Sequence, residues 1–133
     1  EDELVWYVNE RLAMVGTCFD SSMDTAELRL LLREGQCAKI ESELLPRFGT
    51  AVSLVRNTSL QTTEVLRLHK RLLQALSTMH AALASLARTC ANPDSPEVQT
   101  GLERFHAGRD AALDFLSQLL VLAREHDVDL RFE

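Results

Sequence analysis

The sequence contains little of the chemistry that β-sheets and their turns require. Its 133 residues include only five glycines and three prolines, and aromatic residues make up 5% of the chain. Turns between strands draw on glycine and proline, and strands are enriched in aromatic and β-branched side chains. Leucine and alanine predominate instead, and both favour helices because they lose little side-chain freedom there. The composition therefore predicts an all-α fold in a single domain.

Long apolar runs are also missing. The longest apolar stretch, around residues 116–123, is far shorter than the roughly 20 residues that a membrane-spanning helix needs. We therefore expect no membrane span. The net charge of −6 disfavours general binding to nucleic acid, so nucleic acid is not expected among the partners.

The three cysteines, Cys18, Cys37 and Cys90, are few and odd in number. Their spacing fits no metal-binding motif and no evident disulfide framework. This usage favours a reducing compartment, which predicts a location in the cytoplasm or the nucleus.

Apolar residues recur every three or four positions along most of the chain, which is typical of helices. We predict an antiparallel bundle of four long helices over residues 1–126. The first helix runs over 2–15, the second begins at Asp24, the third follows a possible Thr58–Gln61 capping box, and the fourth runs from a Ser95 cap to about residue 126. Gly35 and Pro46 interrupt the second pattern; we expect one long kinked helix, or five helices in all if the chain divides between Pro46 and Gly49.

The strongest pattern is a heptad seam in the third helix, with apolar residues alternating by four and three. It contains one ionisable residue, His69. A histidine here can act as a pH switch or fix the packing register, or it can lie at the bundle edge with its ring partly wet; we favour the last of these. The seam consists of Val65, His69, Leu72, Leu76, Met79, Leu83, Leu86 and Cys90.

Catalytic and metal-binding motifs are scarce. A di-metal site in a helical bundle needs two Glu-x-x-His motifs, and the sequence has one, Glu103 to His106. Cys37 and Cys90 fall on apolar stripes, where a thiol behaves as a small hydrophobic group. We therefore expect neither an enzyme nor a cofactor nor a bound metal.

The charges are unevenly distributed along the chain. Residues 44–93 contain six basic residues and one acid, whereas both flanking segments are acidic. The basic residues include a cluster on one helix, Arg67, Lys70 and Arg71, in which the two arginines are four residues apart and share a face. Arginine pairs well with carboxylates, so this cluster is a candidate site for a partner with an acidic surface. The alternative is that the segments complement one another within the fold.

Two further segments are candidate contacts with a partner. The loop 17–23 carries Phe19 and Met23, two large apolar side chains outside any stripe. The C-terminal tail, residues 127–133, alternates polar and apolar residues as a strand does, and could add to the edge of a partner's sheet. Its apolar residues are Val128, Leu130 and Phe132.

Together these features predict a non-enzymatic protein–protein interaction module, an adaptor or subunit of an intracellular multiprotein complex. The first alternative is a homodimer that associates through the heptad seam. The second is a bundle that binds metal or catalyses a reaction through Glu103 and His106.

Overall fold

Helices are the only regular secondary structure in the described part of the protein. The computed structural model describes residues 2–7, 25–92 and 94–125, and these ranges contain no strand. Its elements are α1 (Asp2–Trp6), α3 (Thr25–Arg33), α4 (Cys37–Lys39), the π-helical turn η4 (Ile40–Leu44), α5 (Leu45–Arg56), α6 (Thr63–Thr89) and α7 (Pro96–Glu125). The predicted all-α fold is confirmed.

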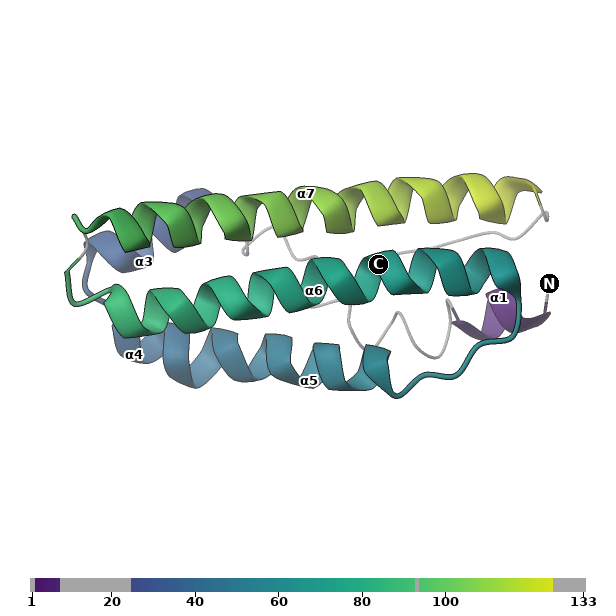
Figure 1. Ribbon diagram of the computed structural model, residues 1–133, viewed down its shortest axis with the longest axis horizontal. Helices are drawn as coiled ribbons and strands as arrows, with labels where there is room; N and C mark the ends of the chain where they lie inside the picture. Colours follow the sequence, from purple (N-terminus) through teal and green to yellow (C-terminus); the bar gives the residue numbers. More distant parts are fainter. Residues whose placement is uncertain (1, 8–24, 93, 126–133) are drawn as a thin grey trace.

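The bundle is built around α6 and α7, which lie antiparallel side by side (Figure 1). The helix α5 packs on α6, and α3 packs on α7 near the end where α6 and α7 are joined. Four helices thus pack together, as predicted. Only three helical stretches are long, however. The first is the continuous run of α4, η4 and α5, the second is α6 and the third is α7.

The second predicted helix divides at Gly35, not between Pro46 and Gly49. Gly35 has φ +70°, a conformation that glycine adopts without steric cost. The amide of Gly35 donates to the carbonyl of Leu32 at 3.2 Å, and the amide of Gln36 donates to that of Leu31 at 2.9 Å. These paired bonds close the C-terminus of α3 as a Schellman motif. The expectation of one long helix through this point is wrong.

Pro46 does not end the helix, although it lacks an amide hydrogen. It lies in the first turn of α5, directly after the π-helical turn Ile40–Leu44. A proline ring inside a helix collides with the carbonyl four residues earlier. Here that carbonyl belongs to Ser42, within the wider π turn. The π turn thus gives room to the proline, and the helix continues to Arg56.

The predicted heptad seam forms the centre of the core. All eight of its residues are buried, with relative exposures between 0 and 5%. Phe105 of α7 meets Phe48 of α5 edge to face, with ring centroids 5.9 Å apart. Phe115 is also fully buried, whereas the adjacent Leu116 is only partly buried. Full burial of a large apolar side chain contributes about 1.5–3 kcal/mol, so the seam and these phenylalanines supply much of the driving force for folding.

Two predicted helix caps are not formed. Thr58 donates its hydroxyl to the carbonyl of Leu54 at 2.8 Å and does not cap α6, which begins at Thr63. Ser95 directly precedes α7, but its hydroxyl oxygen has no hydrogen-bond partner and so does not cap the helix. A carboxylate described below binds the main chain directly before α6.

Two glycines of α7 allow α6 and α7 to approach closely. A Cβ atom at Gly108 would lie 2.6 Å from Met79 Cγ and 3.1 Å from the carbonyl oxygen of Ala75. One at Gly101 would lie 2.8 Å from the end of the Leu86 side chain. Since main-chain atoms cannot move aside as a side-chain end can, the spacing of the two helices is fixed most firmly at Gly108.

We predict that Gly108→Ala destabilises the protein by about 1–3 kcal/mol, the usual cost of overpacking. The loss is expected even though alanine stabilises an isolated helix by about 1 kcal/mol relative to glycine. Gly101→Ala is the matched variant, and it should cost less because the Leu86 side chain can shift. Urea unfolding followed by circular dichroism measures both. A more stable Gly108→Ala protein would contradict the close approach of α6 and α7.

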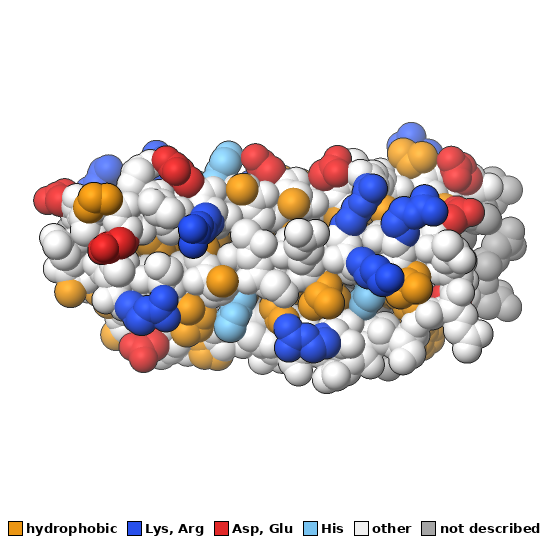
Figure 2. Space-filling model, in the orientation of Figure 1, with side chains coloured by type: hydrophobic (Ala, Val, Ile, Leu, Met, Phe, Trp, Pro, Cys, Tyr) orange, Lys and Arg blue, Asp and Glu red, His pale blue; other side chains and the backbone are white. Residues whose placement is uncertain are grey.

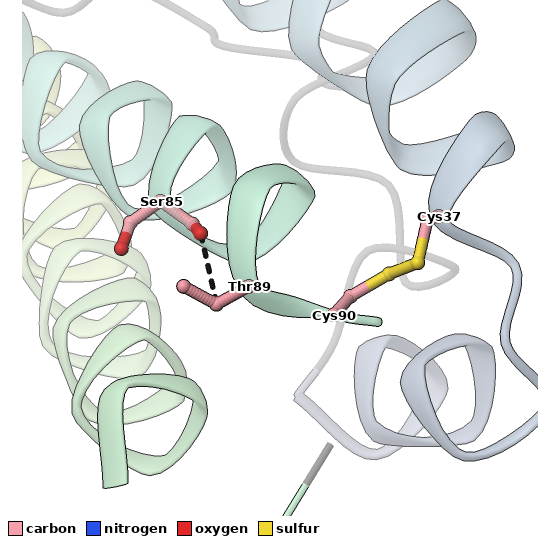
Figure 3. Close-up of a disulfide and its surroundings, with 4 residues drawn as sticks. All are labelled: Cys37, Ser85, Thr89 and Cys90. Atoms are coloured by element: carbon pink, nitrogen blue, oxygen red, sulfur yellow. Dashed lines mark hydrogen bonds between the residues drawn. A yellow bond between two sulfur atoms is a disulfide. The ribbon is translucent and has the colours of Figure 1, made fainter. Parts of the chain in front are cut away.

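A disulfide joins Cys37 at the start of α4 to Cys90 at the end of α6 (Figure 3). The Cα atoms are 5.9 Å apart, and 53 positions separate the residues in sequence. Beside Cys90, the Thr89 hydroxyl donates to the Ser85 carbonyl at 2.9 Å within the last turn of α6. The sequence shows no evident disulfide framework, yet the structure pairs these two cysteines. The cysteine usage was the premise of the argument for a reducing compartment, so the cytoplasmic or nuclear location stays a prediction without that support.

We predict that Cys37→Ser/Cys90→Ser lowers the free energy of unfolding by about 2–4 kcal/mol, because the disulfide closes a long loop in the unfolded chain. The same loss should follow reduction of the wild-type protein. Cys18→Ser, which leaves this disulfide intact, is the control. Thiol titration of the unreduced, denatured protein should find one free thiol, and three would contradict the pairing.

Candidate functional site

The predicted basic cluster lies on the exposed side of α6. Arg67, Lys70 and Arg71 are all exposed. Lysine and arginine side chains gather on this part of the surface, over the N-terminal half of α6 and the C-terminal half of α7 (Figure 2). The other predicted contact residues lie outside the described residues: Phe19, Met23, Val128, Leu130 and Phe132.

A groove of about 490 Å³ runs between α6 and α7 at this place. Its walls include Arg67 and Arg71 but not Lys70, so the structure divides the predicted cluster. We call it the α6–α7 groove. It is lined by Glu64, Arg67, Leu68 and Arg71 of α6 and by Gln118, Val121, Leu122 and Glu125 of α7.

The groove combines an apolar base with charged walls. Leu68 and Leu122 are each 7% exposed, whereas Val121 is 54% exposed. Because α6 and α7 are antiparallel, Glu64 near the start of α6 and Glu125 at the end of α7 belong to the same end of the bundle. The arginines lie further along α6. The groove therefore has acidic residues at one end and arginines further along, and its base is apolar.

Hydrogen bonds hold one of the arginines in position. Arg71 donates from Nη1 to Gln118 Oε1 across the groove. Gln118 in turn donates from Nε2 to Asp114 Oδ2 at 2.7 Å, one turn earlier on α7. The Asp114 carboxylate orients the amide of Gln118, and the amide oxygen then receives the guanidinium. Arg71 keeps further N–H donors that can pair with a carboxylate.

The α7 half of the groove was missed by the sequence analysis. Gln118, Val121 and Leu122 lie 47 to 51 positions from Arg71 in sequence, and no local pattern connects them with it. The signal that could have found them is the short loop between α6 and α7. It makes the two helices antiparallel neighbours, so that the start of α6 meets the end of α7.

A second hollow, of about 630 Å³, lies on α5 and has no ionisable residue in its lining. It is formed by Pro46, Gly49, Thr50, Ser53, Leu54 and Asn57. Without charged or orienting groups it offers little to specify a ligand.

His69 is buried at 5% exposure, so the favoured expectation of a partly wet ring is wrong. The Tyr7 hydroxyl lies 2.8 Å from Nδ1 of His69, and the carbonyl oxygen of Val55 lies 2.6 Å from Nε2. The two rings meet edge to face, with centroids 5.3 Å apart. Burial lowers the pKa of His69 below its usual 6.5, although the Val55 carbonyl acts in the opposite direction. Burial likewise raises the pKa of Tyr7.

The carboxylate of Glu3 binds the main chain directly before the first turn of α6. It accepts hydrogen bonds from the amides of Gln61, at 2.9 Å, and Thr62, at 2.6 Å. These bonds lower the pKa of Glu3, Gln61 contributing most. A negative charge is favourable at this end of a helix, where free amides and the helix dipole are positive.

The Glu103 and His106 pair does not face the bundle interior. Both residues are exposed, and His106 Nε2 lies 3.3 Å from Asp110 Oδ2 on the same helix. Within the described ranges, no three histidine, cysteine or acidic residues are grouped as metal ligands would be. The helices in those ranges also lack the length and apolar character needed to cross a bilayer.

Comparison of the chain with protein-family models, with curated proteins and with solved structures found no match in any of the three.

Proposed function

We propose that the protein is a non-enzymatic protein-interaction module, an adaptor or complex subunit, and that it binds a partner with an acidic surface through the α6–α7 groove. The observation that supports this most is the joining of two arginines to an apolar base in one groove. Interfaces between proteins typically combine a buried apolar anchor with arginines.

The chemistry of the groove favours a particular kind of segment in that partner. An apolar side chain would lie on Leu68 and Leu122 beside the exposed Val121. One or two carboxylates would pair with Arg67 and Arg71, whose spacing of four residues places them roughly 6 Å apart along the helix. Arg71 is already held by Gln118, so less side-chain freedom is lost when it binds.

The heptad seam no longer favours a homodimer. Its residues are buried against the other helices of the same chain, and the seam therefore has no free face for a second copy. Glu103 and His106 likewise give no specific support to a metal-binding or catalytic function, because they lie exposed on one helix. The interaction module remains the function that we propose.

We predict that Arg67→Glu/Arg71→Glu weakens binding of the partner at least about tenfold, which corresponds to about 1.4 kcal/mol. The two substitutions replace attraction by repulsion in the groove. Arg88→Glu/Arg104→Glu is the matched control, since it changes the net charge equally at exposed positions outside the groove. Affinity purification with quantitative mass spectrometry identifies the partner, and titration calorimetry then measures its affinity for each variant.

Charge reversal in the partner completes this test. If carboxylates of the partner meet Arg67 and Arg71, replacing those carboxylates by lysine should restore binding to the doubly reversed protein. Equal loss of binding in the two double variants would show a general effect of charge and contradict the groove. Full binding by Arg67→Glu/Arg71→Glu would do the same.

A further inference from the structure

Three elements of the bundle meet at one buried polar contact. Tyr7 directly follows α1, His69 belongs to α6, and Val55 lies near the end of α5. Tyr7 is 1% exposed and His69 is 5% exposed, so water competes little for their hydrogen bonds. His69 accordingly joins α1 to the α5–α6 pair.

The geometry requires one particular tautomer of His69. The Val55 carbonyl oxygen can only accept, so Nε2 carries the hydrogen and donates across 2.6 Å. In the neutral ring Nδ1 then holds a lone pair, and it accepts from the Tyr7 hydroxyl across 2.8 Å. A second proton on Nδ1 would reverse this bond, so that the Tyr7 hydroxyl would have to accept, and it would place a positive charge on a buried ring. The neutral ring therefore suits the contact better than the charged one.

No charged side chain among the described residues stabilises a cation at this place. From α1 the ionisable group that faces His69 is Tyr7, and its pKa is raised, so it stays neutral. From α5 the contact is a main-chain carbonyl, and the adjacent Arg56 is exposed.

The remaining neighbours are likewise not anionic. On α6 the adjacent Lys70 is exposed, and the residues one turn away on the seam, Val65 and Leu72, are apolar. The buried residues in the last turns of α7 are the apolar Leu119, Leu122 and Ala123, while its terminal Arg124 and Glu125 are exposed. An imidazolium at His69 would be buried without a carboxylate to balance it, which is costly.

A second polar contact holds the same segment. Glu3, one turn before Tyr7, accepts from the amides of Gln61 and Thr62 at the start of α6. Leu4 and Tyr7 are buried apolar residues of the segment 2–7. Glu3 and Tyr7 thus each join this segment to the start of α6 by a polar contact.

We infer that α1 is a pH-sensitive latch: it is docked on the α5–α6 pair while His69 is neutral and released when His69 is protonated. The inference is independent of the partner that the α6–α7 groove binds. The rest of the bundle keeps its own core, from Leu72 to Cys90 along α6, so release of α1 is local.

The direction of the pH dependence follows from the lowered pKa of His69. In the released state the ring returns toward its usual pKa of 6.5. Docking is at full strength above about pH 6.5 and weakens as the pH falls, since the released state takes up the proton more readily. Glu3 acts later: its pKa is lowered from 4.5, so its contribution is present above that pH and lost as the pH falls through the lower value.

The single tryptophan of the sequence, Trp6, lies on α1 next to Tyr7 and reports directly on docking. We expect the emission of Trp6 to change as the pH falls from 7 to 5. Circular dichroism at 222 nm should change little over this range, because the long helices remain folded. If both signals change together, the transition is global and the latch is wrong; an unchanged Trp6 emission down to pH 4.5 also overturns it.

His69→Gln supplies an amide that can donate to Val55 and accept from Tyr7 but does not titrate. We expect its Trp6 emission to be constant between pH 7 and 5. Tyr7→Phe removes the hydroxyl that the neutral ring accepts from, and should reduce the amplitude of the wild-type change. His106→Gln, at an exposed histidine of α7, is the control and should behave as the wild type. A pH transition that persists in His69→Gln would overturn the proposal.

Nuclear magnetic resonance of the wild-type protein keeps the test decisive even if a variant folds poorly. The ring nitrogens of His69 should show the Nε2–H tautomer at pH 7. The ring should then titrate with the same midpoint as the Trp6 emission. A different midpoint, or the Nδ1–H tautomer, would refute the latch.

Discussion

The antiparallel packing of α6 on α7 is the interaction on which the rest of the structure depends. At Gly108 the backbone of α7 comes so close to Ala75 and Met79 that even a methyl group would collide with Met79 Cγ and press on main-chain atoms at 3.1 and 3.2 Å. Such close contact fixes the register of the two helices, since sliding one along the other would bring a larger side chain to the same point. With this register, Arg71 lies opposite Gln118, and the α6–α7 groove follows from it.

Much of this arrangement could be predicted from the sequence because it rests on local periodicity. The seam from Val65 to Cys90 was predicted residue by residue, and every member is buried. The end of α7 was placed within a residue, and its start lies at Pro96, where a proline loses no hydrogen bond. The second predicted helix was less successful, because an apolar stripe stays in phase on both sides of Gly35. Periodicity shows which residues face the core and does not show whether the chain between them turns.

What the sequence could not give are contacts between distant residues. Tyr7 and His69 are 62 positions apart, and the two disulfide cysteines are 53 apart. Cys37 and Cys90 each fit a buried apolar position, and only the packing of α4 against the end of α6 brings them together. The same applies to Glu3. Its carboxylate binds the amides of Gln61 and Thr62, because the first turn of α1 lies beside the start of α6.

The position of His69 within the seam explains why a polar residue is tolerated there. In the middle of α6, between Leu72 and Leu86, a histidine would be surrounded by side chains without acceptors, and its burial would be costly. His69 lies instead near the start of α6, where α5 ends and the ring can reach the main-chain carbonyl of Val55, which also accepts from the amide of Thr58 at 3.2 Å. Nε2 of the ring donates to this carbonyl, and Nδ1 is then available to the Tyr7 hydroxyl, which belongs to a third segment of the bundle. The end of one helix thus supplies the polar partner that makes a buried histidine stable, and the histidine supplies the acceptor by which Tyr7 attaches α1. Because one imidazole makes both bonds, the α5–α6 junction and the attachment of α1 meet at a single side chain.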